Sequence, residues 1–114
     1  MRKFENLLLL VILFASMIVR NEAIPGGWTP IKNLKDPHVQ QIANFAVIEY
    51  DKQSGANLKL VNVIRGDTQV VAGISYRLVL AASNGPSTGK YQAVVLEKAG
   101  LQDKKLISFT SLYD

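Results

Sequence analysis

The sequence has 114 residues, a formal net charge of +4 and no cysteine. This length predicts one domain, and the lack of cysteine excludes disulfides and thiolate metal sites, so a packed core must stabilise the fold. The positive residues are scattered and form no basic run with interleaved aromatic residues. We therefore expect no nucleic-acid partner.

Residues 1–23 have the features of a secretory signal peptide. Arg2 and Lys3 precede the apolar stretch LLLLVILFASMIV, and Ala23 is the expected last residue of the signal. The alternative is a membrane anchor, but the apolar stretch is shorter than the roughly 20 residues that span a bilayer. We expect residues 1–23 to be removed and residues 24–114 to form one secreted domain without membrane contact.

The segment after the signal begins as a flexible connection and then becomes extended. Pro25-Gly26-Gly27 indicates flexibility, because two glycines follow a proline. Trp28 and Ile31 suit the start of a short strand, which Pro30 confines to the edge of a sheet because proline has no N–H to donate.

One helix is expected, over about residues 37–53. Asp36 can cap its start, Pro37 suits its first position and Gly55 ends it. Apolar residues recur there at helical spacing, which predicts one buried face. They are Val39, Ile42, Ala43, Ala46, Val47 and Tyr50.

The rest of the chain is rich in strand-forming residues. Four stretches qualify: NLKLVNVIR, ISYRLVLAAS, KYQAVVLEK and KLISFTSLY. Turn signals separate the later ones at residues 83–90 and 99–103. One helix followed by antiparallel strands predicts an α+β fold, with the helix packed across a four- to five-stranded antiparallel sheet.

The turn of the first hairpin has two candidate positions. Gly66-Asp67 has typical turn residues, but it makes the strands unequal and leaves Gly73 inside a strand, where glycine weakens the structure. A turn within residues 69–73 balances the strands and turns Gly66 into a bulge or bend. It also exposes two valines at the turn, and exposed apolar groups of this kind can mark a binding site.

Three motifs, spread along the chain after the expected signal, resemble those of the plant cystatins, or phytocystatins, which inhibit papain-like cysteine proteases. Gln69-Val70-Val71-Ala72-Gly73 matches the Q-x-V-x-G of the family's first inhibitory hairpin. The stretch IANFAVIEY is similar to the family's helix motif, with Asn44 in place of the usual basic residue. Gly26-Gly27 lies near the mature N-terminus, as in the family. The order and spacing agree over nearly the whole mature chain.

The second hairpin departs from the family pattern. The family carries a proline-tryptophan pair where this chain has Ala99-Gly100. Tryptophan buries a large apolar area and is often a binding hot spot, so its loss should weaken affinity by about 1–3 kcal/mol. Leu101 can contact the target instead.

The resemblance implies an inhibitory wedge. Gly26, Gly27 and the two hairpins, with residues 69–73 and 99–100, would enter the protease cleft together. The apolar residues of the first hairpin would cover the catalytic cysteine and histidine without offering a peptide bond for attack. Inhibition would then be reversible and competitive, by a monomer that needs no cofactor.

The sequence leaves two alternatives to an inhibitor. An enzyme is disfavoured, because the sequence has no cysteine, its lone histidine (His38) follows a helix cap, and its acids show no metal-ligand or paired-acid spacing. A secreted binding or defence protein of the same fold, with inhibition weakened by Ala99-Gly100, is the other alternative.

The long first hairpin can also exchange with a second copy to give a domain-swapped dimer, which would consume the inhibitory turn.

Overall fold

The structure, a computed structural model, describes residues 27–98 and 103–112. Its elements in chain order are β1 (Thr29–Pro30), α2 (Pro37–Ser54), β2 (Lys59–Val70), β3 (Ile74–Asn84), β4 (Ser87–Glu97) and β5 (Lys104–Leu112). The expected signal peptide at residues 1–23 lies outside the described residues.

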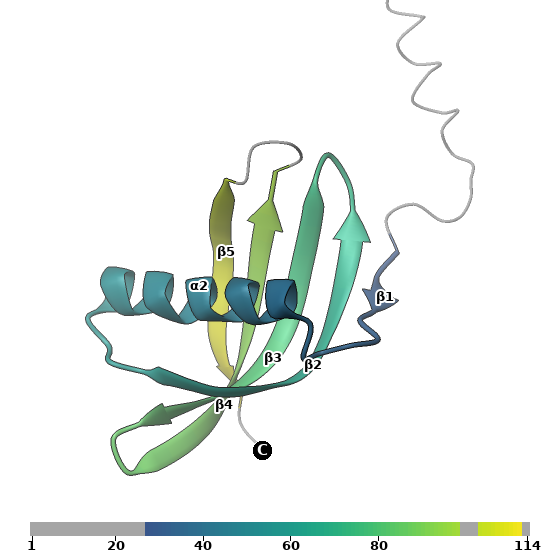
Figure 1. The fold of residues 1–114 in the computed structure, drawn as a ribbon. Coiled ribbons are helices and arrows are strands. Elements are labelled where there is room, and N and C mark those ends of the chain that lie inside the picture. The colour runs from purple at the N-terminus through teal and green to yellow at the C-terminus, as the bar shows by residue number, and fades with distance from the viewer. Residues whose placement is uncertain (1–26, 99–102, 113–114) are drawn as a thin grey trace, which may run out of the picture.

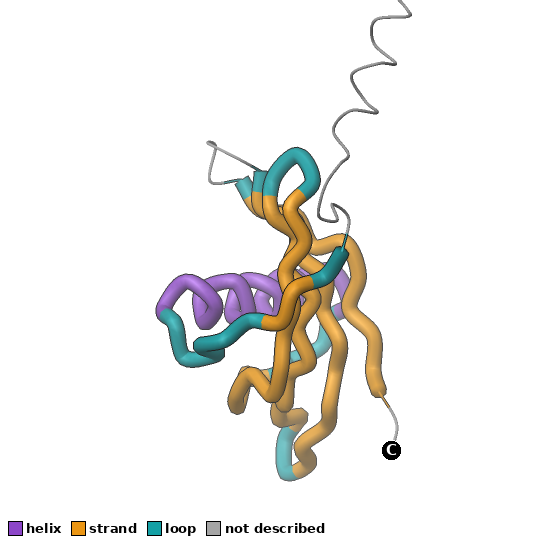
Figure 2. The backbone as a smooth tube through the Cα atoms, turned by 90° about the vertical axis from the view of Figure 1, so that its right-hand side faces the viewer, coloured by secondary structure: helices purple, strands orange, loops and turns teal. Residues whose placement is uncertain are grey.

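The five strands form one antiparallel sheet in the order β1-β2-β3-β4-β5, with α2 across one of its faces (Figure 1). In the perpendicular view the helix covers this inner face, whereas no described element covers the other, outer face (Figure 2). The predicted α+β fold is therefore confirmed. Within the described residues, no helix is both long and apolar enough to cross a membrane.

Helix α2 begins and ends close to the predicted residues. The carboxylate of Asp36 accepts a hydrogen bond from the backbone N–H of His38 at 2.8 Å, and Pro37 occupies the first turn. Gly55 has φ 80°, and its N–H donates to the carbonyl of Asp51 at 2.9 Å. Only glycine takes this left-handed conformation without strain, so the helix ends there.

The core lies between the predicted apolar face of α2 and the inner face of the sheet. The largest fully buried side chains are those of Ile42, Leu78, Leu80 and Val95. Each contributes about 1.5–3 kcal/mol to folding by leaving water. At the end of the helix the ring of Tyr50 stacks on that of Phe109, with 4.2 Å between the ring centres. These contacts fix the helix against the sheet without a disulfide.

The first hairpin turns after Val70, which pairs with Ile74. Of the two candidate positions, the later one is therefore correct. Strands β2 and β3 have 12 and 11 residues, so the two sides of the hairpin are balanced. The turn consequently projects beyond the sheet's core region.

Gly66 is not the bulge or bend that the sequence suggested. It pairs with Leu78 in regular register, and the register shifts come earlier, around Val61 and Ile64. The reason for a glycine is close packing: a Cβ at this position would lie 2.6 Å from Cδ2 of Leu78 and 3.0 Å from Cδ1 of Ile31. A side chain at residue 66 would displace a fully buried leucine.

The turn between β3 and β4 is narrower than the turn signals at residues 83–90 indicated. Asn84 pairs with Ser87, so Gly85 and Pro86 alone form the turn. Gly85 has φ 68°, a value that glycine adopts readily. The neighbouring polar residues that look like loop are strand, because cross-strand pairing extends to the end of the hairpin.

Candidate functional site

Three segments converge at one end of the sheet. In β3, Ile74 pairs with Val70 on one side and with Glu97 on the other. The first tip, which we define as residues 69–74, is therefore level with the end of β4, where the second hairpin begins. Thr29 of β1 pairs with Thr68, which brings the N-terminal segment to the same end (Figure 1).

The first tip exposes a cluster of aliphatic side chains. Val70 is 71% exposed, Val71 54% and Ile74 36%. Burying one such side chain stabilises a protein by about 1.5–3 kcal/mol. A loop that only faces water forgoes this stabilisation when it carries exposed aliphatic residues. Their exposure suits a tip that is covered by another molecule.

The backbone of the first tip is tightly constrained. The N–H of Val71 donates to the carbonyl of Gly73 at 3.0 Å, closing the loop across three residues. Ala72 has φ 55° and Gly73 has φ 129°. An alanine in the left-handed region costs about 1–2 kcal/mol, and strain of this kind concentrates at functional sites. The paired strands β2 and β3 hold Val70 and Val71 in one fixed orientation.

Gln69 occupies a different position from the rest of its motif. It pairs with Ser75 inside the ladder and is partly buried. The structure therefore brings Val70, Val71 and Ala72 to the exposed surface, and places Gln69 and the buried Gly73 in the framework that shapes it.

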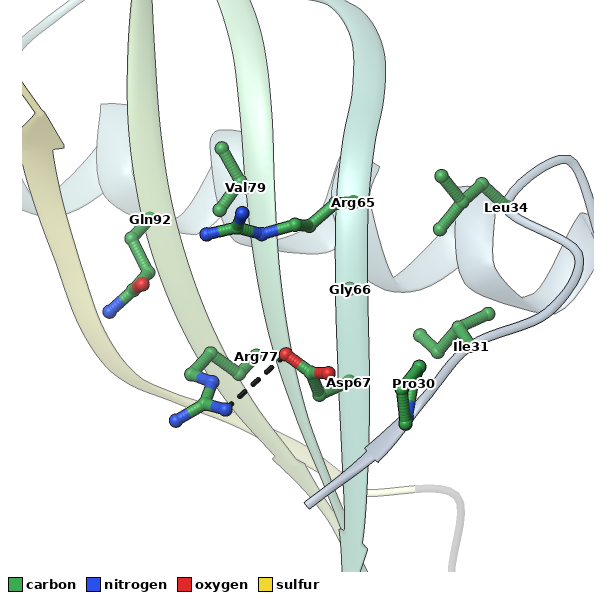
Figure 3. Close-up of a pocket in the computed structure, with 9 residues that line it drawn as sticks. All are labelled: Pro30, Ile31, Leu34, Arg65, Gly66, Asp67, Arg77, Val79 and Gln92. Atoms are coloured by element: carbon green, nitrogen blue, oxygen red, sulfur yellow. Dashed lines mark hydrogen bonds and ion pairs between the residues drawn. The ribbon is translucent and has the colours of Figure 1, made fainter. Parts of the chain in front are cut away.

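The N-terminal segment lies along the edge of the sheet. The guanidinium of Arg77 lies 4.2 Å from the ring centre of Trp28. It also pairs with the carboxylate of Asp67 at 3.3 Å (Figure 3). A cation over an indole is attractive by about 0.5–2 kcal/mol. Trp28 therefore anchors this segment to the sheet. Gly27 is exposed, and Gly26 lies outside the described residues.

Ala99 and Gly100 of the second hairpin also lie outside the described residues. The base of this hairpin is described: the N–H of Lys98 donates to the carbonyl of Asp103 at 3.0 Å, and Glu97 pairs with Lys104. The second hairpin thus starts beside the first tip, while the contact role of Ala99 and Gly100 stays a prediction.

A polar cluster beneath the second hairpin was missed by sequence reasoning, which noted only that His38 follows a helix cap. Nε2 of His38 lies 2.8 Å from Oε1 of Glu97, and the hydroxyl of Tyr76 donates to the same oxygen at 3.3 Å. Burial, reinforced by the charge of Glu97, raises the pKa of Tyr76 to about 12. The cluster ties the start of α2 to the end of β4. His38 and Glu97 are 59 positions apart in the sequence, so no local signal indicates their contact.

The site offers apolar surface and backbone rather than reactive groups. In the described part of the chain, no three His, Cys, Asp or Glu side chains are grouped to hold a metal ion. The exposed atoms of the first tip are aliphatic carbons and backbone amides of residues 70–72. Such a surface can occlude a groove by shape and desolvation.

The helix across an antiparallel sheet, together with three segments at one sheet end, defines a cystatin-like protein. The salivary cystatin of the soft tick Ornithodoros moubata superposes with a TM-score of 0.69 at 22% identity, covering 79% of this chain and 100% of that one. At this identity the likeness shows the fold alone.

Sequence comparison defines the family. Cysteine proteinase inhibitor 1 of Actinidia chinensis var. chinensis is 48% identical over 90 residues, which cover 79% of this chain and 78% of the relative. The chain belongs to the plant cysteine proteinase inhibitors, the phytocystatins.

A second relationship points to another class of protease. A family model described as "Aspartic acid proteinase inhibitor" matches residues 31–112. The solution structure of the squash aspartic acid proteinase inhibitor is 31% identical, with a TM-score of 0.60, and covers 82% of this chain and 99% of that one. Relatives with this fold are thus named as inhibitors of two different classes of protease.

Proposed function

We propose that this protein is a reversible, competitive inhibitor of papain-like cysteine proteases. The observation that carries the proposal is the first tip: Val70 and Val71 are more than half exposed on a turn closed by a hydrogen bond. This tip holds the family's Gln69–Gly73 motif. The relatives' names, which specify cysteine proteinase inhibition, support the same activity.

The mechanism follows from the shape and stiffness of the tip. Two long paired strands and the strained turn hold the aliphatic side chains in place before binding, so docking loses little conformational entropy. Burying Val70 and Val71 in the cleft then removes exposed apolar surface from water. No peptide bond of the inhibitor has to lie where the catalytic groups of the protease could attack it, because the first tip enters the cleft as a closed turn.

The N-terminal glycines and the second hairpin complete the proposed wedge. Gly26 and Gly27 carry no side chains that could collide with the walls of the cleft. Ala99 and Gly100 offer far less contact area than a tryptophan would. We therefore propose that the first tip supplies most of the affinity. A Gly100→Trp variant should bind papain more tightly, by about 1–3 kcal/mol at most.

Inhibition of aspartic proteases is a second candidate, favoured by the family-model match over residues 31–112. The two candidates are separated by titrating one preparation of the mature chain, isolated as a monomer by gel filtration, against papain and against pepsin. A stoichiometric loss of papain activity with pepsin unaffected supports the first proposal. Loss of pepsin activity alone supports the second.

The same titration tests the alternative that inhibition has been lost. If neither protease is inhibited at large excess, the chain is a cystatin-fold binding protein without this activity. Testing Gly100→Trp alongside locates the cause. If it restores papain inhibition, the missing tryptophan is responsible, and if it does not, the first tip itself is incompetent.

A further inference from the structure

The outer face of the sheet can be assigned residue by residue from the strand register. Side chains alternate along a strand, and residues directly opposite in paired strands share a face. Leu78 and Leu80 are fully buried against the helix side, so Arg77 and Val79 point to the outer face. Arg65 pairs with Val79 and Lys90 with Ala81, which places both cations on that face too.

Charge is segregated between this outer face and the rest of the described molecule. The outer face holds five cations and a single acid, namely Lys59, Arg65, Arg77, Lys90, Lys105 and Asp67. The other five lysines, Lys32, Lys35, Lys52, Lys98 and Lys104, are balanced by five acids, Asp36, Glu49, Asp51, Glu97 and Asp103. The excess positive charge of the described residues therefore lies on one face.

The five outer-face cations, which we call the cation stripe, occupy successive rows along the strand direction, although they lie on four different strands. The outward rows of the sheet pass through residues 75, 77, 79, 81 and 83 of β3. In that order the rows contain Lys105, Arg77, Arg65, Lys90 and Lys59. Successive rows are about 7 Å apart, because each strand residue advances about 3.4 Å. The stripe thus presents one cation per row over roughly 27 Å.

A hollow of about 580 Å³ opens in the middle of the stripe. Arg65, Asp67, Arg77, Val79 and Gln92 line it from the outer face, with the helix behind the sheet (Figure 3). The charge of Asp67 is offset by its ion pair with Arg77. Arg77 is held by Asp67 and Trp28, whereas the exposed guanidinium of Arg65 has no ion-pair or hydrogen-bond partner among the described residues. A carboxylate seated here can accept a paired hydrogen bond from Arg65 and another from the amide of Gln92.

The ordinary explanation for such a face is a solvated surface that keeps the protein soluble. That explanation requires charge but not charge of one sign. Like charges at diagonal cross-strand positions, such as Arg65 and Arg77, oppose folding, whereas mixed signs support it. Four of the five successive rows carry an unopposed positive charge, since Asp67 offsets Arg77 within its own row. This one-sided excess needs a reason, and a linear polyanion that neutralises it supplies one.

We propose that the cation stripe binds an acidic polysaccharide, with one carboxylate in the central hollow and others along the rows. Hydroxyl and amide side chains beside the cations suit sugar hydroxyl groups, namely those of Asn62, Ser75, Gln92, Ser108 and Thr110. A single-stranded nucleic acid fits less well, because proteins bind its bases by stacking them on aromatic side chains. Among the described outer-face residues, the only aromatic ring is that of Trp28, which Arg77 covers.

The stripe and the first tip lie on different surfaces. The stripe runs along the outer face, while the aliphatic tip projects from one end of the sheet beyond Val70. A bound polysaccharide therefore leaves the tip accessible, and protease inhibition should persist in its presence.

The proposal is tested by calorimetric titration of the full mature chain with polygalacturonate at low ionic strength. The stripe variant carries Lys59→Gln, Arg65→Gln and Lys90→Gln, and circular dichroism checks that it folds. The matched control carries Lys32→Gln, Lys35→Gln and Lys52→Gln, which remove the same charge from other surfaces. Neutral dextran and a single-stranded oligodeoxynucleotide serve as comparison ligands.

The stripe variant should bind polygalacturonate about tenfold or more weakly, because it loses three exposed ion pairs, while the control changes by less than about twofold. Added salt should weaken the wild-type interaction. The proposal is overturned if polygalacturonate does not bind, if both variants lose affinity equally, or if the oligonucleotide binds more tightly than the polysaccharide.

Discussion

Strand β3 is connected by a turn at each end, and these two turns differ in composition and in backbone strain. The turn at residues 84–87 is polar, and its positive φ of 68° falls on Gly85, where it causes no strain. The first tip is aliphatic, and it places a positive φ on Ala72, which pays a steric penalty. A turn that only connects strands follows local rules, whereas a turn that presents a surface departs from them.

The largest expected effect is on inhibition when charge is added to the first tip. Val71→Asp should weaken papain inhibition by about 2 kcal/mol or more, roughly 30-fold, because the carboxylate must lose its water in the cleft. Inhibition constants for this variant and for Asn84→Asp at the opposite turn make the comparison, and the latter should match wild type. Equal effects at both ends would remove the distinction between them.

The next effect concerns backbone strain and is measured by urea unfolding. Gly85→Ala should lower the free energy of unfolding by about 1 kcal/mol, because alanine is forced to a positive φ. Ala72→Gly should leave the free energy of unfolding unchanged or raise it by up to about 1 kcal/mol, since strain relief opposes the greater freedom of glycine. A large destabilisation by Ala72→Gly would show that the alanine is not strained.

The same Ala72→Gly variant sharpens the role of stiffness. A looser tip has more entropy to lose on docking, so the inhibition constant should rise by a factor of about 2–5, equivalent to roughly 0.5–1 kcal/mol. The matched Gly85→Ala variant should inhibit as wild type does despite its lower stability. Tighter inhibition by Ala72→Gly would contradict a preformed tip.

The smallest effect is confined to alkaline pH and involves Tyr76 beneath the tip end. Its pKa of about 12 lies above the ordinary value of 10.0, so the folded state holds the phenolic proton more tightly than the unfolded state. The stabilisation is fully present below pH 10 and declines as pH rises towards 12. Tyr76→Phe should flatten this decline in unfolding measurements between pH 9 and 12. An unchanged slope would show that another group is responsible.

The sequence predicted those features that depend on local chemistry. Asp36, Pro37 and Gly55 are enough to bound the helix, and the helical spacing from Val39 to Val47 identifies its buried face. The position of the first turn was undecided between two places on physical grounds, because residue type favoured Gly66 and strand balance favoured Gly73. The family motif separated them, and the strand register confirmed the later turn.

Features that depend on long-range pairing were not predicted. The packing role of Gly66 comes from Leu78 and Ile31, which reach it from two other segments. The contact between His38 and Glu97 likewise joins the helix start to a distant strand. The excess positive charge of the outer face depends on which residues of neighbouring strands pair with each other. The lysines and arginines are scattered in the sequence, so the sequence does not reveal this pairing.

Amide hydrogen exchange in the presence and absence of inactivated papain tests most directly whether the first tip enters the protease cleft. The account predicts that papain slows exchange in peptides covering residues 68–76 and leaves residues 83–90, at the far end of the same strand, unchanged. Protection at the far end with none at the first tip would contradict it.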